Sequence, residues 1–183
     1  MRIPILNASR WSGVVLLALL PTGSIGATDA APRAADPYRL HFYQLHTGER
    51  LDVVYRRGDD YDPGALARVD HVLRDYRNGE IRSYDPRLLD LLHELMLALG
   101  RPDGEIDVVC GYRTPHTNEY LRSHGHGVAK RSLHMQAMAI DIRVPGVSTS
   151  ALRDAALRLG RGGVGYYADS DFVHVDVGRV RRW

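Results

Sequence analysis

Two short runs constrain the fold of this 183-residue chain more than any other feature. They read AIDIRV at residues 139–144 and FVHVDVG at residues 172–178, and each places ionisable residues inside an apolar, strand-like pattern. Alternate side chains of a β-strand share one face of the sheet. Each run therefore predicts a strand with one apolar face for the core and an opposite face that carries Asp141, or His174 and Asp176.

A polar strand face on an antiparallel sheet is usually solvated, so each run alone allows that simpler interpretation. The two faces are more informative together, because His134 stands seven residues before Asp141 and both residue types are metal ligands. A hydrolytic zinc site uses three protein ligands, drawn from His nitrogens and a carboxylate, and leaves one position for water. His134, Asp141 and His174 supply this set.

The spacing between His134 and Asp141 indicates what the chain must do locally. A straight helix would separate the two residues by about 10 Å along its axis, and a straight strand by more than about 20 Å. Neither arrangement lets both side chains bind one metal ion at about 2 Å. We therefore expect the chain to fold back near residues 135–138 (MQAM), with His134 on a loop and Asp141 in the following strand.

The rest of the chain predicts an α+β domain with a small antiparallel sheet and helices packed on it. Helical patterns begin at Asp62 and Asp85, each a capping residue followed by proline, and the first is expected to stop at Asn78-Gly79. The expected helices are 62–76, 85–100, 115–122 and 148–160. The expected strands are two within 39–55 around a turn at Gly48, one at 105–111, and 139–144 with a hairpin at 162–178.

The N-terminus has the pattern of a secretory signal peptide. Arg2 and Arg10 form a basic start, WSGVVLLALL is a short apolar stretch, and small residues follow. The apolar stretch is shorter than the roughly 20 residues of a membrane span, although an uncleaved anchor is an alternative. We expect residues 1–30 to be a signal peptide, residues 31–37 a flexible leader, and residues 38–183 the folded domain.

Charge and cysteine content exclude several classes of protein. The formal charge is +2, and it becomes +1 when Arg2, Arg10 and Asp29 leave with the signal peptide. Because the chain has no dense basic stripe, we do not expect a nucleic-acid partner. Cys110 is the only cysteine, which excludes an internal disulfide and a thiolate cluster, and we expect it to be a buried strand residue.

Several motifs resemble those of the zinc D-Ala-D-Ala peptidases. SLHMQAMAID at residues 132–141 resembles the Ser-x-His-x-x-Gly-x-Ala-x-Asp signature of the carboxypeptidases, the VanX-type dipeptidases and their endopeptidase relatives. GYRTPHTN at 111–118 resembles the companion Arg-bearing motif, and residues 162–183 are most similar to MepK-type murein endopeptidases. The resemblance covers nearly all of the chain after the signal peptide. It departs at Ala137, where the family commonly has the Gly that a tight fold-back favours.

The resemblance implies roles for individual residues. His134, Asp141 and His174 would be the zinc ligands, and Arg113 would bind a substrate carbonyl or carboxylate. The general base is left between two residues: Asp171 matches an acid found three residues before the last His ligand in many relatives, whereas Asp176 shares the strand face of His174. Asp176 is alternatively the carboxylate that orients a ligand. Ser132 would brace the loop, and His124 and His126 are either extra site residues or part of a solvated loop.

The implied protein has a hedgehog/D-Ala-D-Ala peptidase-like fold, with residues 38–183 as a zinc peptidase domain. It would be an exported, periplasmic murein endopeptidase that hydrolyses peptide cross-links through a metal-activated water. Its partners would be peptidoglycan peptide stems and cross-links, with no nucleic acid, no membrane after signal cleavage, and a monomeric state. The alternatives are a non-catalytic peptidoglycan-binding module and a D,D-carboxypeptidase, and the bond that is cleaved is left open.

Overall fold

An eight-stranded sheet organises the computed structural model, which describes residues 37–125 and 128–183. The predicted signal peptide, nearly all of the predicted leader, and His126 therefore lie outside the described residues. The strand order is β3-β2-β1-β4-β5-β7-β6-β8. The strands are β1 Pro37–Gln44, β2 Arg50–Arg57, β3 Asp60–Tyr61, β4 Glu105–Cys110, β5 Ala139–Arg143, β6 Gly163–Tyr167, β7 Phe172–Asp176 and β8 Arg181–Arg182.

The α+β class is confirmed, but the sheet is mixed and larger than the small antiparallel sheet expected from the sequence. Five of its neighbouring pairs are antiparallel, whereas β1 pairs with β4 and β6 pairs with β8 in parallel. A parallel pair needs a long crossover connection, and residues 62–104 supply it between β3 and β4. This crossover places β4, and the Arg113 motif that follows it, beside β5.

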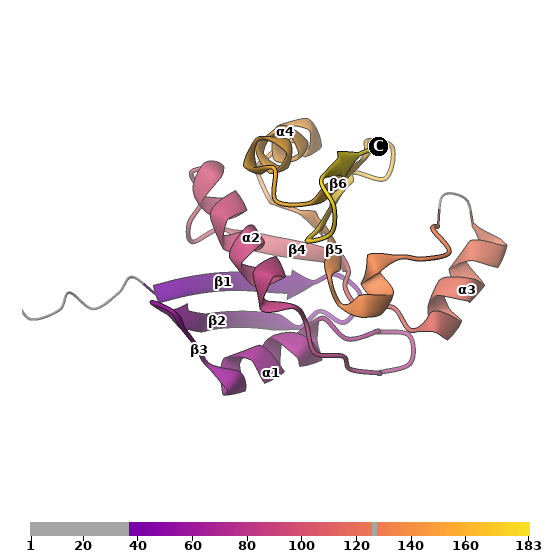
Figure 1. The fold of residues 1–183 in the computed structure, drawn as a ribbon, viewed down its shortest axis with the longest axis horizontal. Helices are drawn as coiled ribbons and strands as arrows, with labels where there is room; N and C mark the ends of the chain where they lie inside the picture. The colour runs from indigo at the N-terminus through magenta and orange to yellow at the C-terminus, as the bar shows by residue number, and fades with distance from the viewer. Residues whose placement is uncertain (1–36, 126–127) are drawn as a thin grey trace, which may run out of the picture. The chain divides into compact units, whose positions relative to one another are not determined.

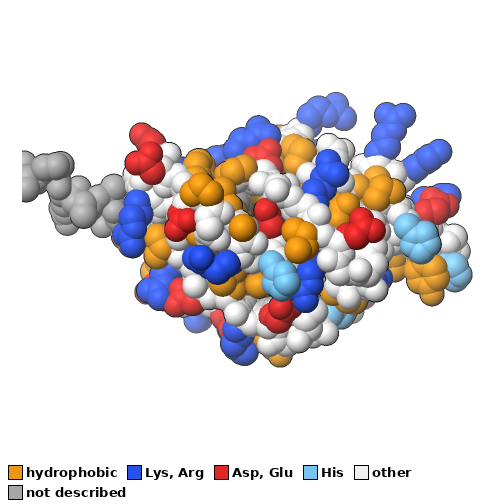
Figure 2. Space-filling model, turned by 90° about the horizontal axis from the view of Figure 1, so that it is seen from below, with side chains coloured by type: hydrophobic (Ala, Val, Ile, Leu, Met, Phe, Trp, Pro, Cys, Tyr) orange, Lys and Arg blue, Asp and Glu red, His pale blue; other side chains and the backbone are white. Residues whose placement is uncertain are grey.

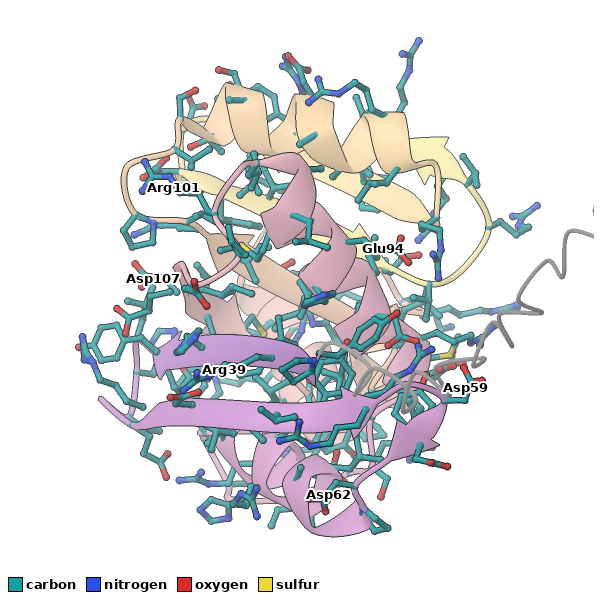
Figure 3. The ribbon with its side chains drawn as sticks, turned by 90° about the vertical axis from the view of Figure 1, so that its left-hand side faces the viewer. Arg39, Asp59, Asp62, Glu94, Arg101 and Asp107 are labelled. Carbon is teal, nitrogen blue, oxygen red and sulfur yellow. The ribbon has the colours of Figure 1, made fainter. Side chains whose placement is uncertain are left out.

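Four α-helices and one 3-10 helix complete the described fold: α1 Pro63–Val72, α2 Pro86–Ala98, α3 Pro115–His124, α4 Thr149–Leu159 and η1 Leu133–Gln136. The side chains of Asp62, Asp85, Thr114 and Ser148 accept hydrogen bonds from backbone N–H groups of the first turns, as N-caps do. Figure 3 shows Asp62 at the start of α1.

Helix α1 ends at Val72, earlier than the expected stop at Asn78-Gly79. Asp75 explains the early end, because its side chain accepts hydrogen bonds from Arg77 N and from Thr114 N and Oγ1. Asn78 N and Gly79 N both donate to the Asp75 carbonyl, which closes a turn in place of further helix. A short acidic side chain that binds nearby backbone groups competes with the helix in this way.

The helices cover the sheet at different places (Figure 1). Helix α1 packs against β2, α2 packs against β1 and α4, and α4 packs against β6 and β7. Glu94 on α2, labelled in Figure 3, pairs with Arg161 just after α4. Helix α3 lies apart from the other helices, next to the segment that leads to η1 (Figure 1). Strands β5 and β7 carry the ionisable residues that the sequence singled out, Asp141 on β5 and His174 and Asp176 on β7.

Strands β5 and β7 are buried on both faces. The expected apolar faces are confirmed, since Ile140, Ile142, Val173 and Val175 are fully buried. The opposite faces are buried too: Asp141 and His174 are each 7% exposed and Asp176 is 0% exposed. The simpler interpretation of a solvated polar face is therefore wrong, and a specific set of contacts must compensate these ionisable groups.

The outer surface is unremarkable in composition. Acidic and basic side chains are interspersed over the face that Figure 2 shows. Across residues 37–125 and 128–183, the helices lack the combined length and apolar character that crossing a membrane requires.

Candidate metal centre

His134 lies in the 3-10 helix η1, and its side chain is buried. Ser132 caps this helix, and Ala137 ends it in the left-handed conformation with φ of 52°. The predicted fold-back near residues 135–138 is thus present, and it occurs at Ala137, where the signature that this chain resembles has Gly. His134 Nδ1 lies 2.7 Å from the Gly111 carbonyl oxygen. Since a carbonyl only accepts, Nδ1 carries the hydrogen, and Nε2 is left with a lone pair.

Asp141 and His174 face each other from neighbouring strands. They are direct partners in the antiparallel register of β5 and β7. His174 Nε2 lies 3.1 Å from Asp176 Oδ2, so this nitrogen donates to the carboxylate. The other ring nitrogen of His174, Nδ1, points to Asp141 Oδ1 at 2.8 Å. Two central strands therefore bring one carboxylate oxygen and one imidazole nitrogen together.

Three ligand atoms converge at this point. His134 Nε2 is 3.2 Å from Asp141 Oδ1 and 3.1 Å from His174 Nδ1. Tetrahedral ligands about 2.0–2.1 Å from a zinc ion stand about 3.3 Å apart, close to the separations seen here. Because outside hydrogen bonds leave lone pairs on both nitrogens, three electron-rich atoms meet in a buried space. A cation at their centre would turn this mutual repulsion into attraction.

Burial and the contacts among the three residues shift their pKa values. Burial lowers the pKa of His134, against the opposing effect of Asp141. Burial would raise the pKa of Asp141, but the charges and hydrogen bonds of His134 and His174 hold it well below its usual range. Burial would lower the pKa of His174, yet hydrogen bonds to Asp141 and Asp176 raise it. The carboxyl group of Asp141 is therefore ionised and the His134 ring neutral at neutral pH, which are the forms that metal ligands need.

Asp176 is completely engaged by donors. Its carboxylate accepts hydrogen bonds from Gly163 N at 3.0 Å, Gly178 N at 2.8 Å and Arg181 Nη2 at 2.6 Å, in addition to His174. Burial would raise the pKa of Asp176, and these donors lower it. The geometry matches the alternative role predicted for Asp176, a carboxylate that orients the His174 ring.

Asp171 lies in the turn between β6 and β7, with φ of 52°. Its carboxylate accepts a hydrogen bond from Thr149 Oγ1 and lies 3.7 Å from Arg143 Nε. Together with Asp107 it lines a separate cavity rather than the one at His134. The structure therefore does not bring Asp171 together with the three converging side chains.

Arg113 borders the converging atoms and is only 9% exposed. Its Nε has no hydrogen-bond partner in the described part of the chain. The loop that carries it is held firmly, because Arg113 N donates to the His134 carbonyl and Thr114 binds the buried Asp75. A preorganised guanidinium with free donors fits the predicted role in binding a carbonyl or carboxylate.

A cleft of about 350 Å³ opens over the site. Asp141 is the only acidic side chain among its described lining residues. Sequence reasoning did not identify its aromatic and additional cationic lining. The lining residues are Arg113, Val128, Ala129, Arg131, Ser132, Leu133, His134, Asp141, Tyr167, Ser170, Phe172, His174, Arg181 and Trp183.

Cys110 is nearer to the site than the sequence indicated. It ends β4, is half-buried, and pairs with Asp141 in the β4–β5 register. Its Sγ lies within 4.8 Å of ligand atoms of His134 and Asp141. Burial, followed by the negative charge of Asp141, raises the pKa of the Cys110 thiol to about 12. It is therefore a neutral neighbour of the site at ordinary pH.

His124 is placed away from the converging ligands. It is exposed at the end of α3, where its ring stacks on Tyr120 and its Nδ1 lies 2.9 Å from the Tyr120 carbonyl oxygen. It is absent from the lining of the cleft. His124 is therefore solvated, but it ends α3 instead of lying in a loop.

Comparison with known proteins gives a consistent result. A family model described as "Peptidoglycan L,D-endopeptidase MepK" (Peptidase_M15_2) matches residues 32–183. The peptidoglycan L,D-endopeptidase MepK of Escherichia coli K12 is 42% identical over 172 residues, which cover 93% of this chain and 92% of that protein. The probable peptidoglycan L,D-endopeptidase MepK of Haemophilus influenzae is 37% identical over 181 residues, covering 97% and 95%.

Proposed function

The chain belongs to the Peptidase_M15_2 family of MepK-type peptidoglycan endopeptidases, and from this premise we propose that it hydrolyses peptide cross-links of peptidoglycan with the help of a zinc ion. The observation that carries the proposal is the convergence of His134 Nε2, Asp141 Oδ1 and His174 Nδ1 within 2.8–3.2 Å of one another. Two imidazole nitrogens and one carboxylate oxygen form a ligand set typical of catalytic zinc.

The residues of this chain fit zinc in their chemistry as well as their spacing. Both ring nitrogens that face the site are neutral acceptors, because Gly111 and Asp176 take the hydrogens on the other nitrogens. When bound, zinc supplies a water molecule of lowered pKa and polarises the carbonyl of the bond to be broken.

Arg113 has the second role in the proposed reaction. Its side chain lines the cleft beside His134, and no described residue occupies its Nε. We assign it to the oxygen of the scissile carbonyl or to a neighbouring carboxylate of the peptide. Donors aimed at the place where negative charge develops are worth roughly 10²–10³ in rate.

The general base is tested by a pair of substitutions. Asp171 is our candidate from the family pattern, and it would have to exchange its contact with Thr149 for the cleft. If Asp171 is the base, Asp171→Asn lowers kcat by about 10²–10⁴-fold without changing zinc content. Thr149→Val is the control, because it releases the same carboxylate without removing it. Equal losses in the two variants would mean that Asp171 only maintains the turn.

The central experiment compares muropeptide profiles after incubation with the protein. Zinc-loaded protein should convert cross-linked dimers to monomers, and chelated protein or His134→Ala should leave them intact at equal folding. Release of terminal D-alanine alone would instead identify a D,D-carboxypeptidase. Binding to sacculi with no change in the profile, with or without metal, would identify a non-catalytic binding module.

We also propose that the protein is exported and acts as a monomer in the periplasm. The basic and apolar pattern of residues 1–30 supports export, and the family match begins at residue 32. Mass spectrometry of protein from a periplasmic fraction should give the mass of a chain that starts near residue 31. Recovery of the full-length chain with the membranes would contradict this.

A further inference from the structure

The cleft is bordered by two chemically different sets of side chains. Arg113 and Arg131 come from the segments that follow β4 and precede η1, whereas Tyr167, Phe172 and Trp183 come from β6, β7 and the residue after β8. Arg181 of β8 also lines the cleft on the aromatic side, but its guanidinium is bound to Asp176. In the sheet order β4-β5-β7-β6-β8, Asp141 on β5 lies between β4 and the strands that carry the aromatic residues. Asp141 is therefore positioned between a cationic and an aromatic border.

The aromatic border is built by specific contacts. The rings of Tyr167 and Phe172, which are register partners in β6 and β7, stack at 4.4 Å between centroids. Trp183 Nε1 donates a 2.9 Å hydrogen bond to Tyr167 Oη. Backbone hydrogen bonds hold Trp183 beside β6, from Trp183 N to the Val164 carbonyl and from Tyr166 N to the Trp183 carbonyl.

The absence of a side chain at Gly165 leaves the space that the Trp183 ring occupies. A Cβ atom at position 165 would lie 2.7 Å from the Trp183 ring, a distance that real Cβ atoms do not tolerate. Gly165 is also the register partner of His174, and the His174 and Trp183 ring centroids are 5.2 Å apart. The indole thus stands directly next to the metal centre while remaining 51% exposed.

We propose that Tyr167, Phe172 and Trp183 form a subsite for an aliphatic side chain of the peptide stem, while the arginine border takes the carboxylates of the same peptide. This inference rests on the proposed function and adds a specificity determinant to it. Covering the half-exposed indole removes apolar surface from water, which favours binding.

The polar atoms of the border argue for an aliphatic occupant over a sugar. The indole N–H is already donated to Tyr167, and Phe172 has no polar side-chain atom. An aliphatic chain needs no hydrogen bond when it leaves water, whereas a hydroxyl-rich sugar ring needs partners for its hydroxyl groups. The cationic border likewise matches the carboxylates of a stem peptide rather than an uncharged disaccharide.

Trp183 itself reports on the subsite, because the chain has two tryptophans, Trp11 and Trp183. In the full-length, zinc-loaded Trp11→Phe protein, all indole emission comes from Trp183. Titration with the stem tripeptide, which contains no cross-link to cleave, should shift this emission to shorter wavelength and saturate. An uncharged disaccharide of N-acetylglucosamine should leave it unchanged. A shift with the disaccharide alone, or no shift with either probe, would overturn the proposal.

Substitutions separate substrate binding from support of the metal centre. Trp183→Ala should raise KM for cross-linked muropeptides about tenfold with little change in kcat or zinc content, and Trp183→Phe should recover most of the loss. Val180→Ala is the matched control, since Val180 is 70% exposed and does not line the cleft. A loss of zinc or of kcat in Trp183→Ala with unchanged KM would show that the ring only supports His174.

The two proposals fail in different ways. Absence of cleavage by the unsubstituted protein would refute the proposed function, whether or not the peptide shifts the emission of Trp183.

Discussion

Two buried carboxylates of this fold, Asp90 and Asp141, have the same exposure of 7% and opposite surroundings. Asp90 accepts hydrogen bonds from Tyr55 Oη at 3.0 Å, Tyr61 Oη at 2.6 Å and Arg56 Nη1 at 3.0 Å. Every partner brings a hydrogen, and Arg56 also brings a positive charge. We call the Asp90 cluster complete, because residues of the chain itself supply the hydrogen bonds and the positive charge that the buried carboxylate needs.

The Asp141 cluster is incomplete by the same criteria. Its partners are imidazole nitrogens whose hydrogens are committed elsewhere, to Gly111 and Asp176. Burial alone therefore does not distinguish a carboxylate whose partners are complete within the chain from one that is suited to bind a cation. What distinguishes them is whether the surrounding groups supply hydrogens and charge, or leave lone pairs that require a cation.

We expect the largest effect from removing one ligand of the Asp141 cluster. His134→Ala or His174→Ala removes one of three ligands, so zinc should be lost and cleavage of cross-linked muropeptides should fall by about 10⁴-fold or more. Zinc analysis of the purified protein and chromatography of the muropeptides measure the two effects. Full activity in either variant, at equal folding, would show that the converging atoms do not form the reaction centre.

Removing the acid of the complete cluster should damage stability instead of metal binding. Asp90→Ala leaves the half-buried Arg56 guanidinium and the hydroxyl groups of Tyr55 and Tyr61 without their partner, so the free energy of unfolding should fall. Urea denaturation measures this loss. The zinc bound per folded molecule should stay the same, and a parallel loss of zinc would mean that the two clusters are coupled.

Metal removal should destabilise the fold through the Asp141 cluster alone. Zinc at about 1,000 times its Kd stabilises the folded state by about 4.1 kcal/mol if it binds only that state. A chelator should therefore lower the melting temperature of the unsubstituted protein and of Asp90→Ala by similar increments. His134→Ala should show no such decrease, and a decrease there would indicate zinc binding at another place.

Asp176→Asn changes the residue that accepts a hydrogen bond from the ring of His174, one of the three proposed zinc ligands. The substitution weakens the hold on the His174 N–H, and zinc affinity should fall by about 10–100-fold. Competition with a chromophoric chelator measures the affinity. Asp90→Asn serves as the control and should leave the affinity unchanged, even where its stability is reduced.

The smallest expected effect removes one donor from the complete cluster. Tyr61→Phe deletes the hydroxyl that donates to Asp90, while Tyr55 and Arg56 remain in place. Loss of one such hydrogen bond should cost about 1–2 kcal/mol in thermal or urea unfolding. Cleavage activity should not change, and a clear change would argue against the separation of the two clusters.

Helix caps and strand alternation could be predicted from the sequence because they depend on residues that are close together in the chain. The caps at Asp62 and Asp85 and the alternation in 139–144 and 172–178 are present as expected. The fold-back between His134 and Asp141 followed from chain dimensions and the assumption that both residues bind one metal ion, and the left-handed Ala137 provides it.

Contacts between distant segments were beyond the same reasoning. The parallel pairing of β1 and β4 depends on where the long crossover returns, which no local pattern specifies. Cys110 reaches the site only because the β4–β5 register sets it opposite Asp141. Asp171 turns away because Thr149 and Arg143 bind it. Gly165, in a strand that ends with Tyr166 and Tyr167, was a signal for a close neighbour, but only the structure shows that this neighbour is Trp183.

The direct register between Asp141 and His174 has a consequence for how such proteins diversify. Two of the three converging side chains stand on central strands whose spacing the whole sheet maintains. Arg113 and Arg131, by contrast, stand outside the regular strands and helices, and Phe172 opens β7 next to a turn. Substitutions in those peripheral segments should therefore change which peptide is bound while disturbing the spacing of Asp141 and His174 less than substitutions in β5 or β7.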